Sequence, residues 1–216
     1  MNELELLPRN ALIKTGEVDH ADWNYKPLLG WIQRLRFKCV LAMLRDLRFD
    51  RLMEVGYGSG VFMPVLKRYC TVLYGVDIHQ KAMEVGEVLK ANGVIAELYS
   101  GSVSMMPFPD EHFDCIVSVS ALEFVEDLES GCREMRRVLS PDGIVVVVMP
   151  RQSRLLDLGL RVLTGENAAD DYAGRRVKVV ATLLRYFRQE EGVSVPGGDG
   201  IMPKVYTGLK LKARDL

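Results

Sequence analysis

Apolar and polar positions along the chain fall into segments with two alternating periods. Short runs rich in β-branched residues predict strands, and longer segments with apolar residues three and four apart predict helices. Ile144–Met149, with four consecutive valines, is typical of a strand covered on both faces. The predicted strands are 52–55, 71–77, 94–99, 113–119 and 144–149, and the predicted helices between them are 61–69, 80–92 and 127–139. This alternation predicts a doubly wound α/β domain with helices on both faces of a mostly parallel sheet.

The segments before this core carry other patterns. Residues 1–29 hold no period and mix Pro, Gly and aromatic residues, so we expect a lid over the domain. Residues 30–47 predict a helix with an apolar stripe and a basic opposite side of Arg34, Lys38 and Arg45. This basic side is either solvated or in contact with a membrane surface or an acidic substrate.

The segments after the core begin with a turn at 140–143 and continue past Pro150. We expect helices at 153–163 and 171–188, then a closing hairpin of 193–195 and 204–211 with the latter as an edge strand. The whole chain, 1–216, is then a single domain with a seven-stranded sheet. Its predicted parts are a lid and helix (1–49), a core (50–150), a helical insertion (151–192) and a C-terminal hairpin (193–216).

The composition is that of an ordinary globular protein, with 48% hydrophobic and 26% charged residues. A formal net charge of −1 gives no general attraction to nucleic acid, so we do not expect a nucleic-acid partner. No apolar run is long enough to cross a bilayer and the N-terminus lacks a signal-peptide pattern, so we expect a cytoplasmic protein. The cysteines form no C-x-x-C pair and are expected to be reduced, with no metal site: Cys39, Cys70, Cys115 and Cys132.

Candidate chemistry concentrates where the first predicted strand ends. Three glycines, Gly56, Gly58 and Gly60, follow this strand at alternate positions and precede a helical pattern. A strand, a glycine turn and a helix N-terminus form a cradle for a nucleotide-like ligand, because glycine lets a ligand approach without meeting a Cβ. A dinucleotide site would need a small residue at position 61, where Val61 stands.

The second predicted strand adds an acid to this cradle. It ends in Asp77, and the carboxyl end of that strand faces the ligand edge of a parallel sheet. A carboxylate there can accept charge-assisted hydrogen bonds from both hydroxyls of a ribose. Ile78, which follows it, could lie against an adenine ring.

Together these segments resemble the class I S-adenosylmethionine-dependent methyltransferases, in particular the small methyltransferase-11-type domains. The resemblance covers about residues 52–150. Residues 54–60 are similar to the family motif E/D-x-G-x-G-x-G, and Val76-Asp77 to its second motif. Residues 113–117 with 121–127 are similar to its fourth-strand motif, and residues 137–143 to its L-K-P-G-G turn.

The resemblance implies S-adenosylmethionine as the cofactor and assigns roles to the matching residues. Glu54 would lie near the methionine amino group, and Asp77 would bind the ribose hydroxyls. Ile78 and Val103 would flank the adenine. Glu54 also favours this cofactor over a dinucleotide, because an acid here would oppose a pyrophosphate. The implied cofactor-binding residues are Glu54, Gly56, Tyr57, Gly58, Gly60, Asp77, Ile78, Gly101, Ser102, Val103, Ser118 and Val119.

The chain departs from the family pattern in two places. Ser102 stands where many relatives have an acid for the adenine amino group, and Phe124 stands where many have a histidine. Methyl transfer from a sulfonium needs alignment, and a base only if the acceptor must lose a proton. The candidates for holding or deprotonating the acceptor are His20, Tyr25 and Glu123, although the lid around Trp23 could equally be a surface loop.

The favoured function is methyl transfer to a small-molecule or lipid-like acceptor. The predicted helices with apolar and basic residues indicate an amphiphilic or anionic acceptor, with peripheral membrane contact as an option. Two alternatives stay open: an NAD(P)-dependent reductase and a non-catalytic scaffold with the same fold. Tyr206 and Lys210 match the Tyr-x-x-x-Lys spacing of short-chain reductases, but they lie on a predicted C-terminal strand, so we interpret the match as chance.

Overall fold

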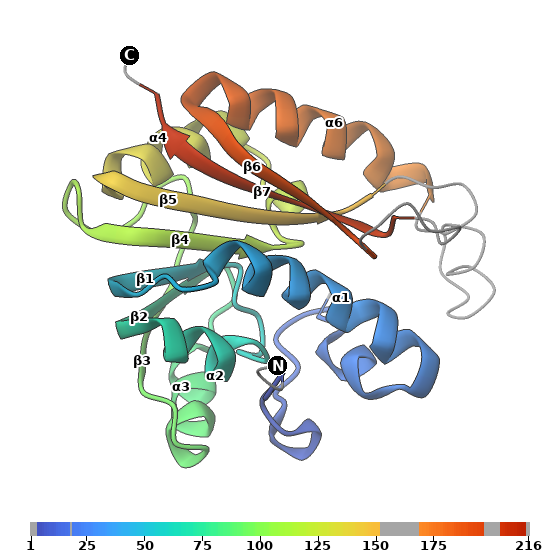
Figure 1. Ribbon diagram of the computed structural model, residues 1–216. Helices are drawn as coiled ribbons and strands as arrows, with labels where there is room; N and C mark the ends of the chain where they lie inside the picture. The colour runs from blue at the N-terminus through green and yellow to red at the C-terminus, as the bar shows by residue number, and fades with distance from the viewer. Residues whose placement is uncertain (1–3, 18, 152–168, 197–203, 215–216) are drawn as a thin grey trace.

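A seven-stranded sheet runs through the centre of the computed structural model, which describes residues 4–17, 19–151, 169–196 and 204–214 (Figure 1). The strand order is β3-β2-β1-β4-β5-β7-β6. The first five strands pair in parallel, and β7 is antiparallel to both of its neighbours. The strands are β1 Phe49–Val55, β2 Cys70–Asp77, β3 Ala96–Ser100, β4 Phe113–Val119, β5 Leu139–Pro150, β6 Phe187–Val195 and β7 Tyr206–Ala213. The predicted doubly wound, mostly parallel sheet is therefore confirmed.

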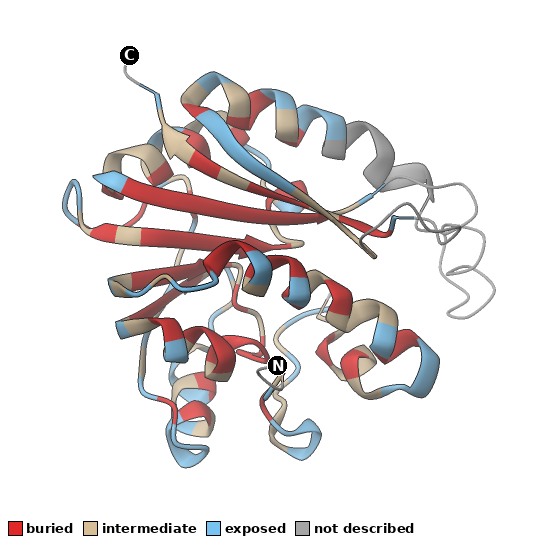
Figure 2. Ribbon diagram, viewed as in Figure 1, coloured by how far each residue is buried: buried red, intermediate tan, exposed pale blue. Residues whose placement is uncertain are grey.

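Helices cover both faces of the sheet, each with its own apolar core. One face packs against α1 Pro27–Leu44, α2 Met63–Leu66 and α3 Ala82–Ala91. The other packs against α4 Leu128–Val138 and α6 Ala169–Tyr186. Figure 2 shows β4 buried along most of its length and β5 buried from Gly143 to Met149, as expected for central strands with helices on both faces. Short 3₁₀ helices are η1 Arg9–Ala11, η2 Ala21–Tyr25, η3 Lys67–Tyr69 and η4 Leu122–Phe124.

The strand order reverses between β1 and β4, which are neighbours in the middle of the sheet. Their carboxyl ends are aligned, with Val55 opposite Ser118. The buried Ser118 hydroxyl donates a hydrogen bond to the Val55 carbonyl over 3.2 Å, which ties the two ends together. Such a reversal point opens a crevice at the carboxyl edge where ligands bind in this fold class.

Two predicted elements differ in extent from the structure. The helix expected at 61–69 is a four-residue α2 followed by η3, because the Gly60 turn continues until Met63 donates to the Gly60 carbonyl at 3.1 Å. The turn expected at 140–143 lies inside β5, where the pairing with β4 shifts register between Leu139 and Ile144. An irregularity at the start of a strand accommodates Pro and Gly without breaking the ladder beyond it.

The C-terminal region differs most from expectation. The helix ends at Tyr186 and β6 begins at Phe187, so the predicted insertion 151–192 is partly strand. Phe187 is fully buried, whereas the next four residues are charged or polar and exposed, as on a protected sheet edge. The edge prediction for 204–211 is wrong: β7 lies between β5 and β6. The helix expected at 153–163 lies outside the described residues.

The sequence predicts reduced cysteines and no segment long enough to cross a membrane. All four cysteines are free thiols, and Cys39, Cys115 and Cys132 are buried. Burial raises the pKa of Cys39 and Cys132 to about 12, so these thiols are poor nucleophiles. Within the described ranges, no helix has the length and apolar character needed to cross a bilayer.

Candidate cofactor site

A glycine turn at the end of β1 forms the floor of the candidate site. Gly56, Gly58 and Gly60 all have positive φ, at 78°, 51° and 71°. The Gly56 N–H donates to the Val76 carbonyl at 2.8 Å, which joins the turn to β2. A Cβ on Gly56 would lie 2.3 Å from the Cβ of Ala121, which follows β4. The turn therefore needs glycine both for its backbone angle and for its approach to the β4 loop.

Gly56→Ala is expected to lower the free energy of unfolding by about 2–4 kcal/mol, because left-handed strain and a steric clash add. Gly101→Ala is the matched control, since a Cβ there meets no atom within 4 Å. Adding Ala121→Gly to the Gly56→Ala variant should recover only the part of the lost stability that comes from the clash with the Ala121 Cβ. Urea denaturation measures all three, and equal stability of the Gly56→Ala variant and the wild type would contradict this account of the turn.

Asp77, the last residue of β2, holds the glycine turn from one side. Its Oδ2 accepts from the Gly58 N–H at 2.8 Å, and its Oδ1 accepts from the His79 N–H at 3.3 Å. The His79 ring completes the contact: Nδ1 accepts from the Lys81 N–H at 3.0 Å, so Nε2 carries the proton donated to the Gly58 carbonyl at 3.0 Å. Asp77 is only partly buried and keeps lone pairs for a ligand.

Glu54 lies directly before the turn and is almost completely buried, with 4% of its surface exposed. Its Oε2 is buried without a hydrogen-bond partner among the described residues. Burial, with the neighbouring Asp77 acting in the same direction and Arg36 opposing both, raises the pKa of Glu54 to about 8. A buried carboxyl of this kind is costly unless a donor or a cation satisfies it.

Arg36, on α1, supplies the opposite charge. Its Nε is buried and, in the described part of the chain, has no hydrogen-bond partner. Burial lowers the pKa of Arg36, and Tyr206, Glu123 and Glu54 act in the opposite direction. Arginine is rarely buried without a partner, because its guanidinium carries five donors.

The packing of α1 places Arg36 beside the glycine turn. Phe37 stacks on Phe62, just after the turn, with ring centroids 4.2 Å apart. On the side towards β7, the Tyr206 hydroxyl donates to the Gln33 side-chain oxygen at 3.4 Å. Gln33 and Arg36 are three residues apart and share a helix face. Glu54 and Arg36 thus provide an acidic and a basic pole at one edge of the sheet.

Two further buried polar atoms belong to the turn itself. The Tyr57 hydroxyl and the Ser59 Oγ have no hydrogen-bond partner within the ranges described. Tyr57 packs edge-on against His79, at 4.9 Å between ring centroids. Orphaned buried polar atoms are few in native structures, so their concentration around one turn indicates a ligand site. Val119, at the end of β4, is also buried and follows the Ser118 that ties β4 to β1.

The residues expected around an adenine ring lie on the β2 and β3 side of the turn. Gly101 donates to the Asp77 carbonyl at 2.8 Å, which brings the two loops together. Ile78 is 77% exposed, whereas Val103 is buried near Gly131 of α4. The Ser102 Oγ already accepts from the Ser104 N–H at 3.1 Å. Ile78 is thus free to cover a ring, while Val103 is part of the apolar core.

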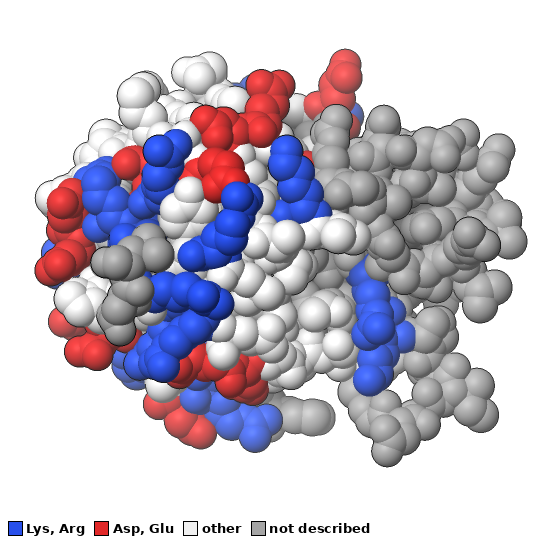
Figure 3. Space-filling model, turned by 90° about the horizontal axis from the view of Figure 1, so that it is seen from above, with Lys and Arg blue, Asp and Glu red and all other residues white. Residues whose placement is uncertain are grey.

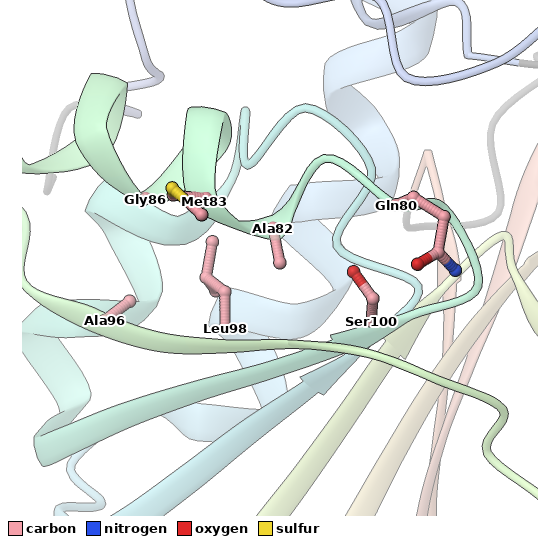
Figure 4. A pocket seen from close by; sticks show the side chains of 7 residues that line it. All are labelled: Gln80, Ala82, Met83, Gly86, Ala96, Leu98 and Ser100. Atoms are coloured by element: carbon pink, nitrogen blue, oxygen red, sulfur yellow. The ribbon is translucent and has the colours of Figure 1, made fainter.

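A groove of about 390 Å³ lies next to this loop, between α3 and β3. Figure 4 shows the Gln80 and Ser100 side chains at one end of it and the Met83, Gly86 and Ala96 positions at the other. It runs along the outer edge of the sheet rather than over the glycine turn. We therefore distinguish it from the cofactor cradle.

The N-terminal lid covers the glycine turn and includes two of the catalytic candidates. Asp19 accepts from the Thr15 hydroxyl at 2.8 Å and from the Ala21 N–H at 3.1 Å, and it lies over Gly58. His20 stacks on Trp23 with ring centroids 4.1 Å apart. The Tyr25 hydroxyl donates to the Leu7 carbonyl, and burial raises its pKa, so this side chain holds the lid rather than acting as a base.

The third catalytic candidate, Glu123, lies on η4 and is buried. It therefore approaches the site from the β4 side, opposite the lid. No grouping of His, Cys, Asp and Glu that could hold a metal ion occurs among the residues described. Sequence reasoning missed Arg36 and Asp19. The signal for Arg36 was a charged residue within the apolar, sheet-facing side of a helix.

Fold and site together define a Rossmann-like domain with a glycine turn after β1, an acid near the end of β1 and another acid at the end of β2. Residues 53–147 match a family described as methyltransferase domain. This central part of the chain is thus similar to the class I S-adenosylmethionine-dependent methyltransferase domains, as the resemblance implied, and the similarity supports S-adenosylmethionine as the cofactor.

Individual relatives support this assignment. The ubiquinone/menaquinone biosynthesis C-methyltransferase UbiE of Pseudomonas entomophila is 30% identical over 148 residues, 62% of this chain and 57% of that protein. The phosphatidylethanolamine N-methyltransferase of Cereibacter sphaeroides is 32% identical over 104 residues, 47% of this chain and 51% of that protein. The chain thus spans little more than half the length of these relatives.

Solved structures share the fold. The N-methyltransferase NodS of Bradyrhizobium japonicum, in complex with S-adenosyl-L-homocysteine, superposes with a TM-score of 0.61 at 16% identity. The match covers 92% of this chain and 90% of NodS. At this identity the likeness extends to the fold, and the residues that bind the cofactor must be argued from this chain.

Proposed function

We propose that this chain transfers a methyl group from S-adenosylmethionine to an amphiphilic acceptor. The observation that carries the proposal is an acid and a base beside the glycine turn: the buried Glu54, and the partly buried Arg36, whose Nε is buried without a hydrogen-bond partner among the described residues. An α-amino acid portion has the complementary charges: its ammonium suits the carboxylate of Glu54 and its carboxylate suits the guanidinium of Arg36. S-adenosylmethionine carries this portion and supplies an electrophilic methyl group on its sulfonium.

The remaining residues of the cradle contact the ribose, the adenine and the methionine portion of the cofactor. Asp77 accepts hydrogen bonds from the ribose hydroxyls, while its Oδ2 also accepts from the Gly58 N–H and holds the glycine turn in place. Ile78 covers the adenine from the solvent side, which accounts for an apolar side chain left 77% exposed. The glycine turn lets the cofactor lie against the backbone. Ser118, bonded to Val55, fixes the spacing of β1 and β4 under the methionine portion.

Charge argues against the dinucleotide alternative. A pyrophosphate on the glycine turn would lie next to Glu54 and Asp77, both acids. Arg36 is positioned for one carboxylate rather than for a diphosphate that extends along the turn. A nicotinamide-dependent reductase therefore has less support from this site than methyl transfer.

The choice of an amphiphilic acceptor rests on the relatives and on the lid. One relative is named as a quinone C-methyltransferase and another as a phospholipid N-methyltransferase. The lid supplies a flat aromatic surface, Trp23 stacked on His20, near the cradle. His20 and Glu123 approach from the lid and from β4, and either could take a proton from the acceptor.

Asp77→Ala is expected to weaken S-adenosylmethionine binding about 10–100-fold, because it removes charge-assisted hydrogen bonds to the ribose. It also removes the acceptor for the Gly58 N–H. Asp77→Asn keeps an acceptor oxygen for that N–H and should give an intermediate loss. Titration calorimetry measures both, and an Asp77→Ala variant with wild-type affinity would exclude the ribose role.

Activity is tested by transfer of labelled methyl from S-adenosylmethionine to an isoprenoid hydroquinone and to phosphatidylethanolamine, each in detergent micelles. A water-soluble catechol serves as the non-amphiphilic comparison. Transfer to either amphiphile, lost in Asp77→Ala, supports the proposal. Transfer to the catechol alone would reject the acceptor class, and tight NADPH binding without S-adenosylmethionine binding would reject the activity.

A further inference from the structure

The outward side of α1 carries large apolar residues that the core does not use. Leu28 is 63% exposed and Trp31 is 41% exposed, and they are three residues apart, on one side of the helix. The remaining large apolar residues of α1 are buried or partly buried against the sheet. Figure 2 shows this division of the helix into a buried and an exposed side. A tryptophan left exposed in this way is typical of a contact surface.

Basic residues continue the same side of the helix. Lys38 and Arg45 are exposed and follow Trp31 by one and two heptads, so they extend the stripe that Trp31 begins. No Asp or Glu occurs in Pro27–Leu44. Lys26, just before the helix, lies over the Trp23 ring at 5.3 Å. We call Leu28, Trp31, Lys38 and Arg45 the α1 outer face.

This face begins at the edge of the sheet where the cofactor cradle lies. The first turns of α1 are held there by the lid and by β7, since Arg34 donates to the Asn24 carbonyl of the lid and Gln33 accepts from Tyr206 of β7. Figure 1 shows the start of α1 at the end of the molecule where the parallel strands terminate. Leu28 and Trp31 thus flank the approach to the site, and the basic residues trail away from it.

A second group of exposed apolar residues provides a comparison. Met83 and Ile95 are 76% and 71% exposed on the α3 and β3 side of the sheet. On this side the exposed acids Glu84, Glu87 and Glu97 outnumber the exposed Lys81 and Lys90, so it offers anionic lipid no net attraction. The upper surface is mixed as well: Figure 3 shows Lys and Arg interspersed with Asp and Glu there. The described part of α1 combines exposed apolar side chains with basic charge alone.

We propose that the α1 outer face docks on an anionic lipid surface, with Leu28 and Trp31 entering the headgroup boundary and Lys38 and Arg45 contacting the headgroups. Tryptophan prefers this boundary, and each basic residue near it adds attraction to anionic lipid. The docking places the mouth of the cradle at the bilayer, where an amphiphilic acceptor resides. This last consequence rests on the proposed function, whereas the docking itself does not.

The test is co-sedimentation of the full chain with vesicles of phosphatidylcholine, with and without about 30% phosphatidylglycerol. Binding is expected to the anionic vesicles only, and to fall several-fold when salt is raised from about 0.1 to 0.5 M. Leu28→Ser with Trp31→Ser should reduce bound protein at least about tenfold. Met83→Ser with Ile95→Ser is the matched control, with equally exposed apolar residues, and should bind as the wild type does.

A second readout uses the two tryptophans of the chain. In a Trp23→Phe variant, Trp31 is the sole indole, and its emission should shift to the blue and be quenched by brominated lipid. Calorimetric affinity for S-adenosylmethionine should stay unchanged in Leu28→Ser with Trp31→Ser, which separates docking from the proposed function. Binding that survives this double substitution would overturn the proposal. So would a vesicle-independent dimer that the substitution dissolves, since the face would then contact a second copy.

Discussion

Replacing Arg36 by methionine is expected to weaken S-adenosylmethionine binding about 30–100-fold without destabilising the free protein. The affinity falls because the carboxylate of the ligand loses a charge-assisted hydrogen-bond partner in a buried site. The free protein keeps its stability, or gains some, because methionine fills a similar volume and removes a guanidinium whose Nε is buried with no described partner. Calorimetric titration and thermal unfolding measure the two effects on the same samples.

Lys38→Met is the control for the Arg36 substitution, since it removes a positive charge from the exposed side of the same helix. It should leave both affinity and stability near wild-type values. Arg36→Lys should lose most of the affinity, because an ammonium cannot reproduce the planar guanidinium fork. A substantial loss of stability in Arg36→Met, with affinity retained, would show that Arg36 supports the fold and does not hold the cofactor.

Arg36 also shows where a linear sequence stops being informative. Arg34, Arg36 and Lys38 alternate along α1, and Arg36 lies within the apolar stripe, but nothing in their spacing says that Arg36 faces the glycine turn. That position follows from how α1 lies across the sheet, where Phe37 meets Phe62 and Gln33 meets Tyr206. Glu54 and Asp77 could be found because each lies at the carboxyl end of a parallel strand, and such ends meet at one edge of the sheet.

The fold also has features that the local sequence predicts and features that it does not. Phe113–Val119 is a strand with the predicted bounds, because an apolar run between turn residues leaves little freedom. The order of β6 and β7 could not be read from the chain, because β6 includes near its start the polar run 188–191, which has no strand period. What decides it is packing: Gly208 on β7 lets Met43 and Cys39 of α1 approach closely. Such long-range contacts have no local signature.

Replacing Glu54 by glutamine is expected to abolish the pH dependence of cofactor binding and to stabilise the free protein at high pH. Burial raises the pKa of Glu54 to about 8 from the ordinary 4.5. A carboxyl whose pKa is higher in the folded than in the unfolded state contributes its full stability below its unfolded-state pKa. That contribution is lost as the pH rises through its folded-state pKa. The wild type should therefore weaken between about pH 4.5 and 8, and Glu54→Gln should exceed it above pH 8 by about 1–3 kcal/mol.

The proton on Glu54 also determines how the affinity for S-adenosylmethionine changes with pH. An ammonium favours the ionised form of Glu54, so the proton must leave when S-adenosylmethionine binds below pH 8. Wild-type affinity should rise up to about tenfold per pH unit towards pH 8, and binding at pH 7 should release close to one proton. Glu54→Gln should bind about 10–100-fold more weakly at pH 8 and release none.

Calorimetry in phosphate and in Tris separates proton release from intrinsic heat, because the two buffers differ in ionisation enthalpy. Glu97→Gln, which changes an exposed acid on β3, is the matched control and should behave as the wild type does. Equal proton release by the wild type and Glu54→Gln would assign the proton to another group. A Glu54→Gln variant that binds S-adenosylmethionine with full affinity would remove the acidic pole on which the amino-acid assignment depends, and Arg36 alone would then have to orient the methionine portion.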